Sequence, residues 1–153
     1  MVADRFVGVH VLGLPQPQGS MKAYTNRATG RPIILDSNDK LKDWRMRVEV
    51  EARRVEAEEH FRVPGKASYR LWVLFQFPEP KSKHCVHKNT RPDLDKLIRA
   101  VCDALTDILL DDDAEIVEMV GAKEWGSKAP GVWIYLTRLD PERTEKELRL
   151  PGM

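Results

Sequence analysis

Four stretches of the chain are rich in apolar residues, with alternation of apolar and polar positions that is partial in the first, which predicts β-strands. The first strand is expected at residues 6–14, where Pro15 and Pro17 end the pattern. The stretch 69–77 carries apolar residues at both odd and even positions, so it is expected in the centre of a sheet. Two later stretches, 116–125 and 132–139, are joined by a turn and could form a hairpin.

Two other stretches carry apolar residues three and four positions apart, which predicts amphipathic helices. The first follows capping residues at 36–39, and one face collects Leu41, Trp44, Val48, Ala52 and Val55. We expect this face to pack on the core, with pairing to a second subunit as the alternative. The apolar positions of the second helix are Leu94, Leu97, Ile98, Val101, Cys102, Leu105, Ile108 and Leu109. Its polar face holds Asp95, Arg99, Asp103 and Asp107.

The composition fits one small domain, because 153 residues with 42% hydrophobic content can bury a sizeable core. No apolar run approaches the roughly 20 residues that span a bilayer, and the first residues lack the pattern of a signal peptide. A cytoplasmic protein without membrane attachment is therefore expected. Cys85 and Cys102 are expected to be reduced thiols. With 25 basic and 24 acidic residues, any signal for nucleic-acid binding has to be local.

Aspartates flank the second predicted helix at both ends. Asp93 and Asp95 stand at its start, where helix capping and the helix dipole offer an alternative explanation for them. Asp111, Asp112 and Asp113 follow its end, where the dipole disfavours anions and a turn before a strand is the alternative. The spacing favours a site for Mg²⁺ or Mn²⁺, because carboxylate oxygens suit hard cations.

Basic residues lie in two loops near these acids. The segment between Glu79 and Asp93 contains no acid and holds Lys81, Lys83, Lys88 and Arg91. An earlier loop or hairpin, residues 19–35, carries Lys22 and Arg27. Both loops are candidates for contact with phosphates, although a plain surface hairpin explains the earlier loop equally well.

Residues 91–116 resemble the signature of the RusA-like Holliday junction resolvases, a family often carried by bacteriophages and prophages. The signature positions are held here by Pro92, Asp93, Asp95, Lys96, Arg99, Asp103, Ala104, Leu105, Asp112 and Asp113. The segment 13–24 is also similar to the opening strand and basic loop of the family. The resemblance therefore covers roughly residues 5–138.

The resemblance implies an α+β fold, in which a single domain at 1–140 packs a small mixed sheet with two main helices and forms a homodimer. A charged tail at 141–153 would follow. The implied activity is symmetric, Mg²⁺- or Mn²⁺-dependent cutting of four-way DNA junctions in recombination and repair, in bacterial or phage-infected cytoplasm. Asp93, Asp95 and Asp113 are then the catalytic metal-binding acids, Asp112 is a further ligand, and Asp103 is a supporting acid.

Three positions depart from the family pattern. Lys96 stands where asparagine is usual, Arg99 replaces a lysine, and Asp107 stands where glycine is frequent. Because arginine stays protonated, we expect Arg99 to stabilise charge on a phosphate and not to donate a proton. The residues expected to hold the DNA backbone are Lys22, Arg27, Lys81, Lys83, Lys88, Arg91 and Lys96. Two alternative functions are a non-catalytic module that binds branched DNA and a less selective Mg²⁺-dependent DNA nuclease.

Overall fold

The computed structural model describes residues 4–19, 22–35, 39–82, 85–126 and 128–141. Its elements are β1 (Arg5–Leu12), β2 (Lys22–Thr25), β3 (Pro32–Leu35), α1 (Asp39–Glu59), β4 (Tyr69–Phe77), α2 (Leu94–Leu105), the 3-10 helix η1 (Asp113–Glu115), β5 (Ile116–Trp125) and β6 (Gly131–Arg138). Four strands form one sheet in the order β1-β6-β4-β5, and β2 and β3 form a separate hairpin. The predicted tail lies outside the described residues apart from Pro141.

The four-stranded sheet is mixed, because β4 pairs antiparallel with β6 and parallel with β5. This arrangement confirms the predicted α+β fold and the interior place of β4. The hairpin suggested for the last two strands does not form, because β4 lies between β5 and β6. Apolar side chains on both faces of β4 suit a strand that lies between two others. The chain crosses back through α2 between β4 and β5, so these two strands run parallel.

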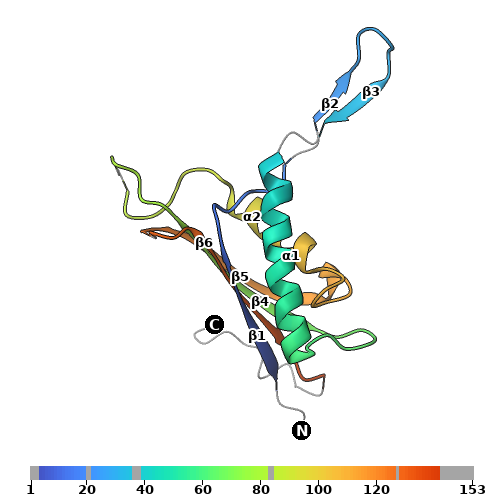
Figure 1. Ribbon diagram of the computed structural model, residues 1–153, viewed down its shortest axis with the longest axis vertical. Helices are drawn as coiled ribbons and strands as arrows, with labels where there is room; N and C mark the ends of the chain where they lie inside the picture. The colour runs from blue at the N-terminus through green and yellow to red at the C-terminus, as the bar shows by residue number, and fades with distance from the viewer. Residues whose placement is uncertain (1–3, 20–21, 36–38, 83–84, 127, 142–153) are drawn as a thin grey trace.

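Both helices cover the same face of the sheet (Figure 1). α1 lies over β1 and buries the predicted set of Leu41, Trp44, Val48, Ala52 and Val55. α2 lies beside α1 and contacts β5. At that contact a Cβ on Gly121 would lie only 2.5 Å from Cδ1 of Ile98. The missing side chain at Gly121 therefore lets the acid-bearing helix lie close to β5.

α2 is shorter than the apolar pattern predicts. The helix ends at Leu105, since Thr106 has extended backbone and its hydroxyl donates a 2.9 Å hydrogen bond to the carbonyl of Cys102. Asp107 follows with a φ of 66°, in the left-handed region, so it does not lie on the helix. Ile108 and Leu109 are nevertheless buried. Their burial after the helix end explains why the apolar periodicity continues too far.

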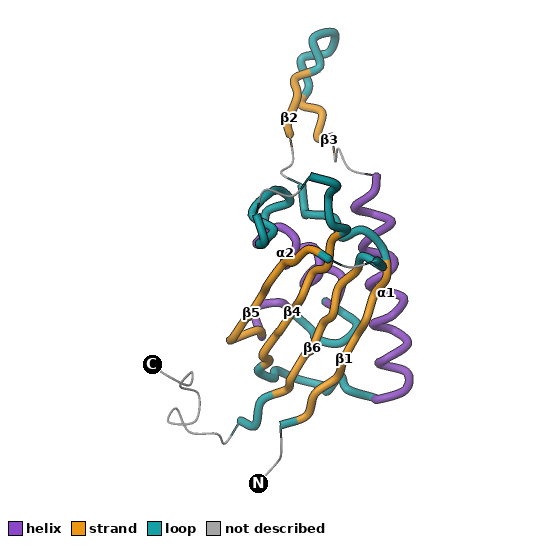
Figure 2. Tube along the Cα trace, turned by 90° about the vertical axis from the view of Figure 1, so that its left-hand side faces the viewer, coloured by secondary structure: helices purple, strands orange, loops and turns teal. Residues whose placement is uncertain are grey.

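No helix in the described part of the chain covers the other face of the sheet (Figure 2). The rings of His10 and Trp133 stack there with centroids 3.7 Å apart, and Trp72 and Tyr135 lie 5.3 Å apart. The candidate acids accompany α2 on the covered side. Among the described residues, no helix combines the length and apolar character needed to cross a membrane.

Candidate active site

The start of α2 presents two exposed carboxylates. Asp93 is the N-cap residue, with extended backbone at φ −68° and ψ 134°, yet its side chain makes no capping hydrogen bond. Its Oδ2 atom instead lies 3.3 Å from Nζ of Lys96, one turn along the helix. Asp95 lies in the first turn. Capping through the side chain therefore does not account for Asp93, and the carboxylate is exposed to solvent.

Lys88 lies just before this helix but is not an exposed cation. Its side chain is 5% exposed, and burial lowers its pKa. Nζ donates to the carbonyl of Arg91 at 2.6 Å and to Oγ1 of Thr90 at 3.2 Å. The ammonium also lies 4.6 Å and 4.3 Å from the ring centroids of Phe77 and Trp125. These contacts give Lys88 a structural role and leave its ammonium group unavailable to a DNA phosphate.

The three aspartates after α2 have different surroundings. Oδ1 of Asp111 lies 2.5 Å from Nη2 of Arg62, in an ion pair. Asp112 caps η1, because its Oδ1 accepts a 2.9 Å hydrogen bond from the backbone N–H of Ala114. Asp113 is the first residue of η1 and is exposed, with no ion pair among the residues that the structure describes. Two of the three acids thus stabilise the turn, and Asp113 is the one best placed to bind a ligand.

Asp112 and Asp113 influence each other's protonation. The backbone N–H of Ala114 lowers the pKa of Asp112. A hydrogen bond with Asp112 raises the pKa of Asp113, and partial burial and the negative charges of Asp112 and Asp103 add to this. A nearby cation would relieve this repulsion between carboxylates.

The structure separates the predicted acids into two groups. Asp93 and Asp95 lie at the start of α2. Near its end, the charge of Asp103 contributes to raising the pKa of Asp113, and that of Asp113 contributes to raising the pKa of Cys102. The eight-residue step from Asp95 to Asp103 corresponds to roughly 12 Å along a helix. Nowhere in the described ranges do three or more acidic, histidine or cysteine side chains come close enough to hold a metal ion. The oxygen donors fit Mg²⁺ or Mn²⁺ in kind, but one copy of the chain presents them as two separate groups.

Three of the remaining candidate cations lie on α2 or in the loop before it. Arg99 is exposed on α2, one turn after Asp95 and one turn before Asp103. Lys81 and Arg91 are exposed in the loop before α2. Other candidates were Lys22, Arg27 and Lys83. Arg27 lies in the exposed turn of the β2–β3 hairpin, which projects from the body in Figure 1, whereas the side chain of Lys22 and all of Lys83 lie outside the described residues.

Three residues that shape the site were not found from the sequence: Arg62, Glu115 and Lys123. Glu115 accepts hydrogen bonds from the backbone N–H groups of Asp111 and Asp112, at 3.1 Å and 3.3 Å, and completes a capping box. The acidic residue three positions after Asp112 was an available signal for this box. Arg62 and Lys123 had no local signal, because their partners lie 49 and 31 residues away.

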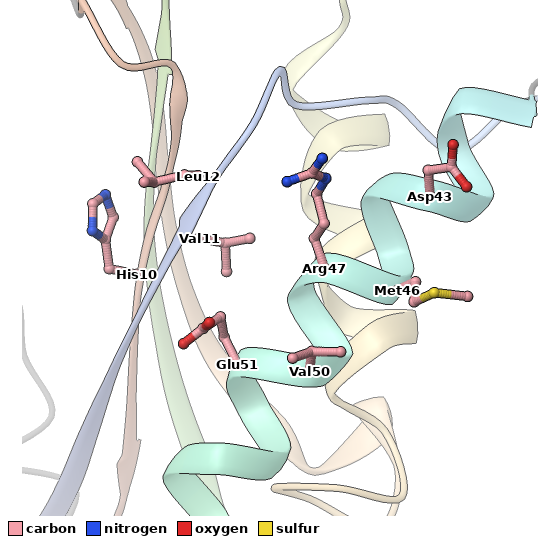
Figure 3. Close-up of a pocket in the computed structure, with 8 residues that line it drawn as sticks. All are labelled: His10, Val11, Leu12, Asp43, Met46, Arg47, Val50 and Glu51. Atoms are coloured by element: carbon pink, nitrogen blue, oxygen red, sulfur yellow. The ribbon is translucent and has the colours of Figure 1, made fainter.

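A hollow between β1 and α1 lies away from the candidate acids. It is lined by His10, Val11, Leu12, Asp43, Met46, Arg47, Val50 and Glu51 (Figure 3). None of the predicted site residues lines it. The candidate site therefore comprises the exposed surface at the two ends of α2 and does not include this hollow.

Comparison with known protein families gives a match for residues 15–137, to the family described as Endodeoxyribonuclease RusA. The match includes both acid groups and the basic loop before α2, and it confirms the resemblance seen in the sequence. Comparison with individual curated proteins gives no match.

Proposed function

We propose a function for this chain as a member of the RusA family of endodeoxyribonucleases, which resolve Holliday junctions. In this proposal it cuts four-way junctions as a homodimer, using Mg²⁺ or Mn²⁺. The proposed ligands are Asp93, Asp95 and Asp113, with Asp112 as a further ligand. The observation that carries the proposal is the placement of exposed acids at the two ends of α2. A second copy of the chain offers a way to bring the two groups together.

The edge of the sheet at β5 is the surface that we propose for this second copy. β5 has ten residues and, within the part of the chain that the structure describes, one neighbouring strand, so no described strand pairs with its other side. Val117, Met119 and Val120 along it are 61%, 47% and 42% exposed. A long apolar edge strand is a template for pairing with another chain. A twofold axis would pair β5 antiparallel with its copy.

This pairing would unite the two acid groups. Nζ of Lys123, near the end of β5, lies 2.6 Å from the carbonyl oxygen of Pro92, so Asp93 lies near the C-terminal end of this strand. Asp113 lies just before its N-terminal end. Antiparallel pairing places the start of one strand beside the end of the other. Each composite site would combine Asp93 and Asp95 of one copy with Asp113 of the other, and two such sites suit a junction with two strands to cut.

The chain's own residues have distinct roles in the proposed hydrolysis. The carboxylates would hold the divalent cation, which when bound would neutralise charge on the non-bridging and leaving oxygens of the phosphate. Arg99, between the two acid groups, would add a permanent positive charge and paired N–H donors for the same phosphate. Lys81 and Arg91 would hold neighbouring phosphates, which offsets the repulsion between DNA and the acids.

The test compares the wild type with Asp95→Asn on an immobile four-way junction, a junction with a mobile core and a matching linear duplex. Each is incubated with Mg²⁺, Mn²⁺ or EDTA, and product lengths are measured on denaturing gels. We expect paired symmetric nicks in a junction only, lost with EDTA and in the variant. Tight junction binding without cutting under either metal would support the binding module, and equal cutting of linear duplex would support a less selective nuclease.

A further inference from the structure

We propose that Lys123 and Lys88 are positioning residues for the acids at the start of α2. Their ammonium groups bind three consecutive backbone carbonyls, those of Thr90, Arg91 and Pro92, in the chain that leads into Asp93. The inference rests on the proposed function, because it assigns these lysines to the orientation of the proposed metal ligands. It replaces the phosphate contact predicted for Lys88.

Lys123 reaches this chain from the sheet. Nζ donates to the carbonyl oxygen of Thr90 at 2.7 Å and to that of Pro92 at 2.6 Å. Both are hydrogen bonds from a charged donor, which are shorter and stronger than neutral ones. Because Lys123 lies on β5, these bonds tie the chain before α2 directly to the edge strand.

Lys88 binds carbonyls of the same segment, and it shares that of Thr90 with Lys123. Nζ donates to the carbonyl of Arg91 at 2.6 Å and lies 3.4 Å from that of Thr90. The side chain is held between the rings of Phe77 and Trp125 and is almost wholly buried. The nearby positive charge of Lys123 contributes to lowering the pKa of Lys88. The carbonyl oxygen of Thr90 lies within hydrogen-bond distance of both ammonium groups, which offsets the repulsion between the two charges.

The carbonyl of Pro92 is the last one before Asp93, so its orientation sets the direction in which α2 begins. The backbone N–H of Leu97 donates a 3.1 Å hydrogen bond to the carbonyl of Asp93, which links the first turn to this starting geometry. Asp95 lies within that turn. Loss of the lysine bonds would leave both carboxylates free to shift, and a displacement of about 1 Å can cost on the order of 100-fold in rate.

The experiment replaces Lys123 by methionine, which keeps a long apolar stem but has no ammonium group. Lys128→Met is the matched control, because Lys128 is exposed beyond the end of β5. We expect single-turnover cutting of the junction to fall at least about tenfold while the junction Kd in EDTA changes less than about twofold. Lys123→Arg, which restores a cationic donor, should recover part of the rate. Unchanged cutting, or a rate loss explained by weaker DNA binding, would overturn the proposal.

Amide hydrogen exchange supplies a measurement that does not depend on cutting. In Lys123→Met and Lys88→Met, we expect exchange to rise at least about tenfold in residues 89–97, with the sheet unchanged and Lys128→Met like the wild type. Unchanged exchange at 89–97, or a uniform rise over the whole chain, would contradict a positioning role. If the wild type cuts no junction with either metal, the proposed function fails, and the exchange result still decides whether these lysines order the chain.

Discussion

The segments before and after α2 both carry acids, and they are held in place by opposite means. Before the helix, the backbone is held: lysine ammonium groups bind carbonyls, and the carboxylates of Asp93 and Asp95 are exposed. After the helix, the carboxylates themselves hold the segment in place. Asp111 pairs with Arg62, and Asp112 caps the following turn.

The difference shows that an acidic residue in a motif is not automatically a ligand. A loop fixed through its backbone leaves its carboxylates available, whereas a loop fixed through its carboxylates occupies them. Three aspartates after α2 therefore contribute chiefly one ligand candidate, Asp113. Because this candidate lies near the other end of the helix from Asp93 and Asp95, the comparison predicts that a complete site needs both ends, and hence two copies.

The largest effect is expected from two single variants, each of which removes one acid at a different end of α2. Asp95→Asn and Asp113→Asn should each lose at least about 100-fold of the cutting rate, because each removes a proposed metal ligand. Mixed and allowed to exchange subunits, the two inactive variants should regain about a quarter of the wild-type sites. Random exchange makes half of the dimers mixed, and one of the two composite sites in each is then intact. The regained products should be single nicks, measured on denaturing gels.

A mixture of Asp93→Asn with Asp95→Asn is the control for this experiment. Both changes fall at the same end of α2, so every site in every dimer would carry a defect and no activity should return. If the mixture of Asp95→Asn and Asp113→Asn also stays inactive after demonstrated subunit exchange, the composite site is wrong.

Arg99 lies between the two ends of α2. It should bind the reacting phosphate whether the acids come from one copy of the chain or from two. Arg99→Ala should lower single-turnover cutting by about 100-fold, the typical cost of removing one donor to developing charge. Arg99→Lys should keep a substantial part of the rate, because a cation remains. Full activity in Arg99→Ala would show that the guanidinium does not act on the reacting phosphate.

Lys96 affects only the first end of the helix, where its ammonium lies 3.3 Å from Asp93. A metal ion at Asp93 would compete with it. Exposed ion pairs contribute roughly 0.2–1 kcal/mol, so Lys96→Asn should lower the Mg²⁺ concentration for half-maximal cutting by about 1.4- to 5-fold. Titration of Mg²⁺ measures this, with Lys128→Asn as the control. A higher Mg²⁺ requirement in Lys96→Asn would contradict competition at Asp93.

The smallest effect is expected from the backbone after the helix. Asp107 has a φ of 66°, a conformation that glycine adopts without strain, so Asp107→Gly should raise the free energy of unfolding by up to about 1 kcal/mol. Asp107→Val should lower it, because a branched side chain is strained there. Urea denaturation in EDTA measures both changes. Equal stability of the glycine and valine variants would show that the backbone conformation at this position does not limit the fold.

Much of the fold follows from the sequence alone. Residue spacing identified the buried face of α1 and the interior strand β4, because periodicity records which side chains avoid water. The signature around α2 also identified the family, and the family match agrees. The acids that the signature names as ligands stay a prediction. In each case the information lies in neighbouring residues, within one turn of helix or a few residues of strand.

Only the tertiary structure decided how distant segments use these residues. The apolar pattern ran past Leu105 because it records the burial of Ile108 and Leu109 but not the helix end. The burial of Lys88 depends on rings from β4 and β5, which its own loop does not reveal. Hydrogen bonds and ion pairs across the fold join residues that no local pattern connects. The sequence could therefore name the acids and place them at the two ends of the helix, while the partners of Asp111 and Asp112 and the lysine bonds to the backbone before Asp93 required the fold.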